Sequence, residues 1–180
     1  MLKLLHAILL GLFGAAVIHI AILFLLPTYS ERDVWAAMAE EAAPYAFVRL
    51  GEGNTNPLLA EEQNPFFETA ACRFDLERGM VRLTSAERVP FWSFSVYDRD
   101  GFNVFNTNDR SATNHALDAL VVNAAQLLDL RKGVPETLAS SLIAQTDIEE
   151  GMIVIRVFVP DESWRIIVER FFEDLRCEAL

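Results

Sequence analysis

The first hydrophobic stretch of the chain is continuous rather than periodic. From Leu4 to Leu26 no Asp, Glu, Lys or Arg interrupts it. A helix of this length, rising about 1.5 Å per residue, can cross the roughly 30 Å of bilayer hydrocarbon. The pattern predicts a transmembrane helix within residues 1–30, with the lipid bilayer as its partner. A cleavable signal peptide is the alternative, but its apolar core usually has about 7–15 residues, and no small-residue cleavage site follows this longer run.

The charges that flank this helix predict its direction. Lys3 and the amino terminus precede the apolar run, whereas Glu31, Arg32 and Asp33 follow it. Positive charge favours the cytoplasmic side of a membrane, so we expect a cytoplasmic N-terminus. The rest of the chain then lies on the other side, which in a bacterium is the periplasmic face of the inner membrane.

Small residues line one face of the predicted helix. Ala7, Gly11 and Ala15 recur every four residues, and His19 continues the series. Such faces let two membrane helices approach closely, so this face predicts contact with another membrane protein or with a second copy of the chain. The simpler alternative is that Gly and Ala are common in any membrane helix. We expect His19 to be neutral and hydrogen-bonded rather than a proton carrier.

A short amphipathic segment, residues 31–44, follows the apolar run. Ser30 is placed to cap a helix there, and Pro44 ends it. Trp35 and Met38 fall on the apolar side of this helix. We therefore expect a connector helix that leads from the anchor to one globular domain, residues 45–180.

Alternation with a period of two, which is typical of half-buried strands, dominates this domain. In Phe91–Tyr97 the even-numbered residues from Trp92 onward are apolar and face one side, whereas Tyr97 faces the other. A turn at Asp98–Gly101 makes Phe102–Asn106 the second arm of a hairpin. Further strands are predicted at Tyr45–Leu50, Thr69–Leu76, Met80–Leu83, Leu117–Val122, Leu138–Thr146 and Met152–Val159.

Several connections and helices complete the predicted domain. The last two strands form a hairpin around Asp147–Gly151, and Gly51–Pro57 is a loop rich in Gly and Asn. Asn123 caps a helix over Ala124–Arg131. The C-terminal helix begins near Pro160, and these apolar residues recur in it at helical spacing: Trp164, Ile167, Val168, Phe171, Phe172 and Leu175. The predicted fold is mainly β, an antiparallel β-sandwich with flanking helices, with a single antiparallel sheet covered by helices as the alternative.

Charge excludes one class of partner. The net charge is −11 over 180 residues, and the basic residues are scattered singly. We therefore expect no nucleic-acid partner and little attraction to anionic lipid headgroups. The simplest role of the acidity is to keep the domain soluble. An acidic docking surface for a basic partner is the alternative.

The sequence contains two cysteines, Cys72 and Cys177. An oxidising compartment would permit them to form a disulfide. Helical spacing, however, places Cys177 opposite Phe171 and Leu175, on the polar side of the C-terminal helix. Two separate thiols are the preferred expectation, and the disulfide remains the alternative.

A polar loop follows the aromatic hairpin. Asp109, Arg110 and His115 gather there and, together with Trp92 and Tyr97, could bind a small apolar or sugar ligand. In most such loops the Asn and Asp side chains bond to nearby backbone amides instead. The ligand-binding interpretation is therefore the less common of the two.

Catalytic and metal-binding motifs are weak. Ser93, Ser95, Asp98 and His115 contain the residue types of a hydrolase triad, but no nucleophile-elbow motif surrounds either serine. One histidine beyond the apolar helix and the lack of paired cysteine spacing argue against a metal site. No glycine-rich phosphate loop is present. We expect no catalysis, no metal and no cofactor.

Five segments resemble one known family: Asn64–Thr69, Cys72–Leu76, Pro90–Asp98, Asn106–Arg110 and Gly151–Pro160. The chain is similar there to domain-of-unknown-function family 1254, which often occurs with its relative, family 1214. Short, membrane-anchored members occur in alphaproteobacteria, whereas longer members are mainly soluble and carry both domains. The resemblance implies a β-sandwich in the cell envelope. It carries over no catalytic residue, because the family has no established mechanism.

These patterns favour a non-enzymatic envelope protein. Its anchored, β-rich domain would bind a partner protein or scaffold a complex at the inner membrane. The alternative hypothesis is a domain that binds or modifies a small ligand at the loop of Asp109 and His115.

Overall fold

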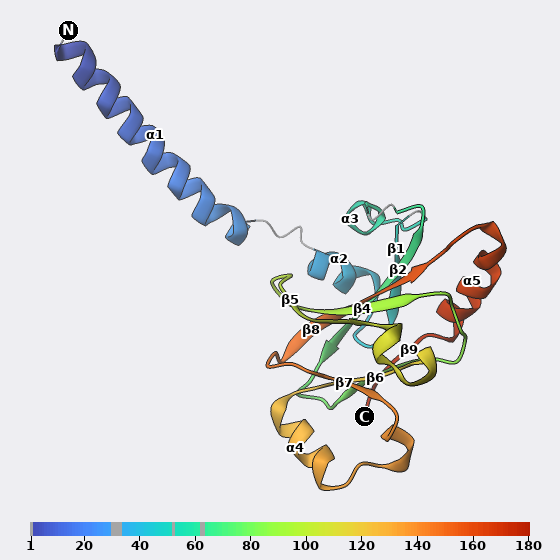
Figure 1. The fold of residues 1–180 in the computed structure, drawn as a ribbon. Helices are drawn as coiled ribbons and strands as arrows, with labels where there is room; N and C mark the ends of the chain where they lie inside the picture. Colours follow the sequence, from blue (N-terminus) through green and yellow to red (C-terminus); the bar gives the residue numbers. More distant parts are fainter. Residues whose placement is uncertain (1, 30–33, 52, 62–63) are drawn as a thin grey trace. The chain divides into compact units, whose positions relative to one another are not determined.

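The computed structural model describes residues 2–29, 34–51, 53–61 and 64–180 (Figure 1). Its internal contacts divide the chain into two units, Met1–Asp33 and Val34–Leu180. The described residues of the first unit form one helix, and the second unit contains all the strands that the described ranges form.

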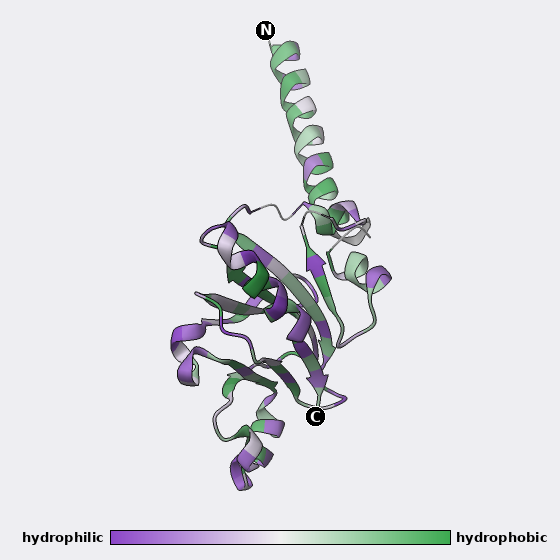
Figure 2. Ribbon diagram, turned by 90° about the vertical axis from the view of Figure 1, so that its right-hand side faces the viewer, coloured by the Kyte–Doolittle hydropathy of each residue, from purple (hydrophilic) through white to green (hydrophobic). Residues whose placement is uncertain are grey.

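The first unit is the apolar helix α1, Leu2–Tyr29. Its segment Leu2–Leu25 is long and apolar enough to cross a membrane, and none of its most hydropathic stretch is buried against protein. Figure 2 shows hydrophobic residues around the whole helix rather than along one stripe. The predicted continuous apolar helix of Leu4–Leu26 is confirmed.

The second unit is a β-sandwich of two sheets. Sheet A has five antiparallel strands in the order β1 Phe47–Leu50, β2 Phe67–Asp75, β8 Glu150–Phe158, β4 Trp92–Asp98 and β5 Asn103–Asn108. Sheet B has four strands in the order β7 Leu142–Gln145, β6 Leu117–Val122, β3 Val81–Ser85 and β9 Arg176–Ala179. Only β6 and β7 among the described strands pair in parallel. The predicted β-sandwich with flanking helices is confirmed.

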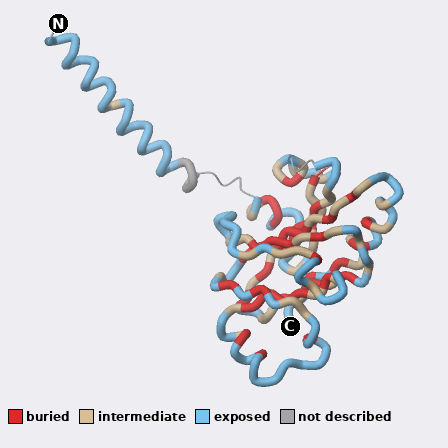
Figure 3. The backbone as a smooth tube through the Cα atoms, in the orientation of Figure 1, coloured by how far each residue is buried: buried red, intermediate tan, exposed pale blue. Residues whose placement is uncertain are grey.

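The main core lies between the two sheets. Sheet A contributes Trp92, Phe94 and Ile155, and sheet B contributes Leu83 and Val121. Figure 3 shows the buried positions concentrated along the strands. The predicted alternation in β4 is confirmed, because burying one face of a strand buries every second residue.

Helices cover the outer faces of both sheets. The helices α2, Val34–Glu41, and α3, Pro57–Ala60, pack on sheet A. Helix α4, Ala124–Lys132, packs on sheet B, and a capping box between Asn123 and Gln126 begins it as predicted. Helix α5, Arg165–Asp174, adds its buried residues to the main core.

The predicted connector of residues 31–44 is not separate from the globular domain. Helix α2 belongs to the second unit, where Met38 is 1% exposed and packs with Ala71 and Val154 on the outer face of sheet A. The Arg73 guanidinium lies 5.3 Å from the centroid of the Trp35 ring. Burial of its apolar side therefore makes α2 part of the fold. The predicted cap, Ser30, lies outside the described residues.

The predicted hairpin of Leu138–Thr146 and Met152–Val159 is wrong. Strand β7 pairs with β6 in sheet B, whereas β8 lies at the centre of sheet A between β2 and β4. The turn around Asp147–Gly151 thus carries the chain from one sheet to the other. Alternation reveals that both segments are strands but does not identify their partners.

The preference for two separate thiols is also wrong. Helix α5 ends at Asp174, and the chain then enters β9, which places Cys177 on the inner face of sheet B at 5% exposure. Its Sγ is bonded to Cys72 of β2, so a disulfide joins the two sheets across 105 residues. The strand period, rather than the helical one, determines where the Cys177 side chain points.

Gly151 lies where two strands and a turn meet, and a Cβ atom there would have no room. It would approach the Tyr97 backbone oxygen at 2.6 Å and the Phe74 ring at 2.8 Å. We expect Gly151→Ala to lower the free energy of unfolding by about 2–3 kcal/mol, because overpacking against backbone cannot be relieved by a side-chain rotation. Denaturant unfolding of the full chain in detergent measures the loss.

Gly133 provides the matched control for this substitution. A Cβ atom at Gly133 meets no atom within 4 Å. Gly133→Ala should change the free energy of unfolding by no more than about 0.5 kcal/mol. Equal midpoints for the two variants would contradict tight packing around Gly151.

Candidate functional site

The polar loop after β5 contains a buried carboxylate in contact with an exposed histidine. Two short 3-10 turns, Asp109–Ser111 and Thr113–His115, form this loop. The Asp109 side chain is 11% exposed, and its Oδ2 lies 3.0 Å from Nδ1 of His115, whose side chain is 66% exposed. This carboxylate orients the imidazole, because a bond at one ring nitrogen determines how the ring is presented to solvent.

The loop backbone is held in an uncommon conformation. Asn114 and His115 both have positive φ, 55° and 56°. The Trp92 indole N–H donates a 3.0 Å hydrogen bond to the His115 backbone oxygen. Since the Trp92 side chain is part of the main core at 1% exposure, this bond fastens the loop to the sandwich. Trp92 thus contacts the predicted site only through its N–H.

One oxygen of the site has no partner. Oδ1 of Asp109 is buried and accepts no hydrogen bond from any described residue. A buried carboxylate oxygen without a donor is costly, so this position is one where a small polar molecule could bond. Ser93 and Ser95, the serines of the predicted triad, alternate with Trp92 in β4, so their side chains face the other side of sheet A from the Trp92 side chain.

Tyr97 does not join this loop. It packs with the α2 cluster on the outer face of sheet A. Burial alone would raise the pKa of Tyr97, but hydrogen bonds with Asn103, Arg156 and Ser95, together with the charge of Arg156, outweigh burial and lower that pKa. The predicted five-residue site is therefore divided between two faces of sheet A.

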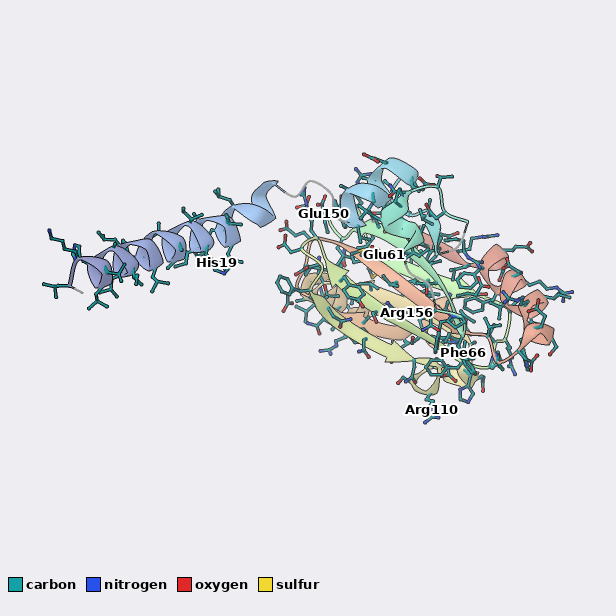
Figure 4. The ribbon with its side chains drawn as sticks, turned by 90° about the horizontal axis from the view of Figure 1, so that it is seen from above. His19, Glu61, Phe66, Arg110, Glu150 and Arg156 are labelled. Atoms are coloured by element: carbon teal, nitrogen blue, oxygen red, sulfur yellow. A yellow bond between two sulfur atoms is a disulfide. The ribbon has the colours of Figure 1, made fainter. Side chains whose placement is uncertain are left out.

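Arg110 lies at the end of β5 and points away from the sheet (Figure 4). Arg110 is exposed, and none of the ion pairs among the described residues includes it. Arg110 therefore does not line a pocket with Asp109. Of the predicted set, the structure brings together Asp109, His115 and the Trp92 N–H.

A groove of about 630 Å³ lies at another place in the domain, and the sequence did not reveal it. Arg49 of β1 pairs with Glu68 of β2 and, at 3.3 Å, with Glu169 of α5, while Arg165 reaches Glu68 at 3.5 Å. The Arg49 guanidinium also lies 3.9 Å from the centroid of the Phe172 ring. The groove is lined by Arg49, Leu50, Gly51, Asn64, Pro65, Phe67, Glu68, Val159, Arg165 and Glu169.

The charges of this groove neutralise one another. Each of its two arginines already contacts a glutamate, and the pairs connect α5 to the edge of sheet A. Partly exposed pairs of this kind contribute little to stability, about 0–1 kcal/mol each. The groove is therefore explained by helix docking. Its paired residues are up to 120 positions apart, as for Arg49 and Glu169, and this separation hides the pairing from sequence patterns.

The small-residue face of α1 is open. Ala7, Gly11, Ala15 and His19 are exposed, and a Cβ atom at Gly11 would meet nothing within 4 Å. The face remains a predicted interface. Within the described ranges no group of three or more His, Cys, Asp or Glu could hold a metal ion.

No family model and no curated protein sequence matches the chain. The VPA0106 protein from Vibrio parahaemolyticus has a similar structure, with a TM-score of 0.55 and 14% identity over 80% of this chain and 32% of that one. An uncharacterised protein from Burkholderia cenocepacia has a TM-score of 0.50 and 12% identity over 84% of this chain and 38% of that one. The chain thus spans 32% and 38% of the lengths of these two proteins, and the likeness shows the fold alone.

Proposed function

We propose that this chain is a membrane-anchored, non-enzymatic binding protein of a bacterial envelope. Helix α1 would cross the inner membrane once, with its N-terminus in the cytoplasm, and the sandwich would bind a partner or scaffold a complex in the periplasm. The observation that carries the proposal is the exposed apolar surface of Leu2–Leu25. A helix that is apolar on all sides and lacks protein cover is stabilised by lipid.

The disulfide supports the periplasmic side. Cys72 and Cys177 are bonded in the core, and disulfides persist in the periplasm but are reduced in most cytosols. Lys3, in the first turn of α1, favours the same direction. The resemblance to family 1254 also implies an envelope location, and membership of that family is part of this proposal.

Purification of the tagged, full-length protein in mild detergent, followed by mass spectrometry of what accompanies it, tests the binding role. We expect a stoichiometric protein partner, either another membrane protein or a second copy. Gly11→Ile should reduce its yield, because the larger side chain keeps a second helix away from the small-residue face.

Ala16→Ile is the matched control. It adds the same side chain at a residue that lies about 140° around the helix from Gly11 and therefore outside the face of Ala7, Gly11 and Ala15, so the partner should be retained. Loss of the partner in both variants would contradict a specific helix interface. Absence of any protein partner would contradict the binding proposal itself.

A small-ligand function is the second candidate, and Asp109 Oδ1 is the observation that favours it. A buried, unpaired oxygen beside an exposed imidazole can bind a hydroxyl or amide of a small molecule. The same purification distinguishes the two functions. The small-ligand function would be supported, and the scaffold proposal contradicted, by two results together. A small molecule would accompany the protein with no protein partner, and His115→Ala would abolish its binding.

A further inference from the structure

The charged groove beside α5 has the size and lining of a small-molecule site. Its volume of about 630 Å³ lies within the roughly 300–1,000 Å³ that ligand pockets in proteins occupy. Charged side chains from β1, β2 and α5 line it together with the apolar side chains of Pro65, Phe67 and Val159. Docking of α5 explains the ion pairs, and the same docking encloses a space beside them in which a ligand can lie.

The ion pairs leave hydrogen-bonding groups of the groove unused. Both described hydrogen bonds of the Arg49 guanidinium, to Glu68 and Glu169, come from Nη2. The Arg165 guanidinium donates through Nε and Nη1. Within the described ranges, nothing accepts from Nη1 of Arg49 or Nη2 of Arg165, and nothing donates to Oε2 of Glu169. The groove therefore offers both donors and an acceptor to a ligand.

The paired contacts also hold these groups in place. The Arg49 guanidinium lies 3.9 Å from the centroid of the Phe172 ring. This contact covers one face of the planar group and leaves the N–H bonds at its edge available. Glu68 contacts both Arg49 and Arg165 and so fixes the two cations relative to each other. A ligand therefore meets groups that are already ordered, which reduces the entropy lost on binding.

The balance of charge selects the class of ligand. The two arginines and two glutamates that line the groove add up to no net charge. An anion would meet Glu68 and Glu169, and a cation would meet Arg49 and Arg165, so neither is clearly attracted. A hydroxyl group both donates and accepts. It can therefore bond to an arginine N–H and to a glutamate oxygen without leaving either charge unpaired.

We infer that the charged groove binds a neutral mono- or disaccharide. Its hydroxyl groups bond to the arginine and glutamate side chains of the groove, and the C–H groups of its ring pack on Pro65 and Phe67. This inference goes beyond the function proposed above, because the site shares no lining residue with the loop of Asp109 and His115 and does not involve α1.

Saturation-transfer NMR on the full-length protein, in a detergent without a sugar headgroup, tests the ligand class. The probes are glucose, galactose, mannose, N-acetylglucosamine, maltose and lactose. We expect the protein to transfer magnetisation to at least one of them, and neither citrate nor inorganic phosphate at the same concentration to displace it. Transfer to none of these sugars, or displacement by either anion, would overturn the inference.

Two matched variants of α5 test the location of the sugar. Arg165 and Arg170 are both exposed on this helix, but only Arg165 lines the groove. Arg165→Met should weaken sugar binding about tenfold, because it removes a charged donor. Arg170→Met should leave the affinity unchanged, and both variants should unfold at nearly the wild-type midpoint. Equal sugar affinities in the two variants would overturn the assignment to the groove.

A third variant separates the groove from the polar loop. His115→Ala should retain the sugar, because His115 does not line the groove. Loss of the sugar on His115→Ala, with retention on Arg165→Met, would place the sugar at the loop and overturn the inference. The protein partner is measured separately through Gly11→Ile. A protein without a bound sugar therefore leaves the partner proposal intact, and a protein without a partner leaves the groove inference intact.

Discussion

Replacing both Cys72 and Cys177 with alanine is expected to lower the free energy of unfolding by about 4–5 kcal/mol. The bond closes a loop of 105 residues between the two sheets. In the chain-entropy account, a crosslink over about a hundred residues removes this much freedom from the unfolded chain. The change is a large part of the roughly 5–15 kcal/mol that stabilises a typical domain. Denaturant unfolding of the full chain in detergent measures the loss.

Reduction of the wild-type protein is the control for this prediction. A reducing agent should move the wild-type unfolding midpoint to that of the double variant and leave the variant unchanged. A wild-type midpoint that does not respond to reduction would show that Cys72 and Cys177 do not pair in solution.

Trp92→Ala is expected to lower the free energy of unfolding by about 3–5 kcal/mol, the usual cost of removing a large buried aromatic side chain. Trp92 is 1% exposed in the main core, and its N–H also holds the His115 backbone. The loop of Asp109 should loosen as well, which amide hydrogen exchange detects.

Phe102→Ala is the comparison for Trp92→Ala. Phe102 is an aromatic residue at the turn of the same β4–β5 hairpin, but it is 69% exposed, so its loss should change stability by no more than about 0.5 kcal/mol. A Trp92→Ala protein with unchanged stability and lost ligand binding would contradict the core assignment. It would instead support Trp92 as a ligand-binding residue.

Local patterns in the sequence were reliable predictors of the fold. The β4–β5 hairpin follows from alternation and one short turn, and the cap of α4 from Asn123 and the residues just after it. Both depend on contacts between residues close in sequence, which propensities and spacing describe well. The same is true of α1, whose apolar character needs no partner to be recognised.

Pairings between distant segments were not predictable in this way. The segments of β7 and β8 both alternate, but nothing in the alternation assigns one to sheet B and the other to sheet A. The final strand β9 has four residues, too few for a distinct period of two. The helical spacing of the segment before it therefore predicts the wrong direction for the Cys177 side chain. Tertiary pairing, rather than local propensity, decided the position of that thiol.

The candidate site was predictable in part. Asp109 and His115 are six positions apart, and one loop brings them into contact. The alternation of β4 already places Trp92 and Tyr97 on opposite faces, so the sequence contained the signal that separates Tyr97 from the loop. The charged groove could not be predicted from the sequence, because Arg49 and Glu169 come from elements far apart in the chain.

The orientation of the full-length chain in spheroplasts tests the central claim most directly. A cleavage site for a specific protease and a tag are placed after Leu180, and the protease is added outside intact cells. We expect removal of the tag without lysis, together with cysteines that, in the denatured protein, react with a thiol reagent only after reduction. A periplasmic domain would be contradicted if the tag stayed protected until the cells were lysed and both thiols reacted without reduction.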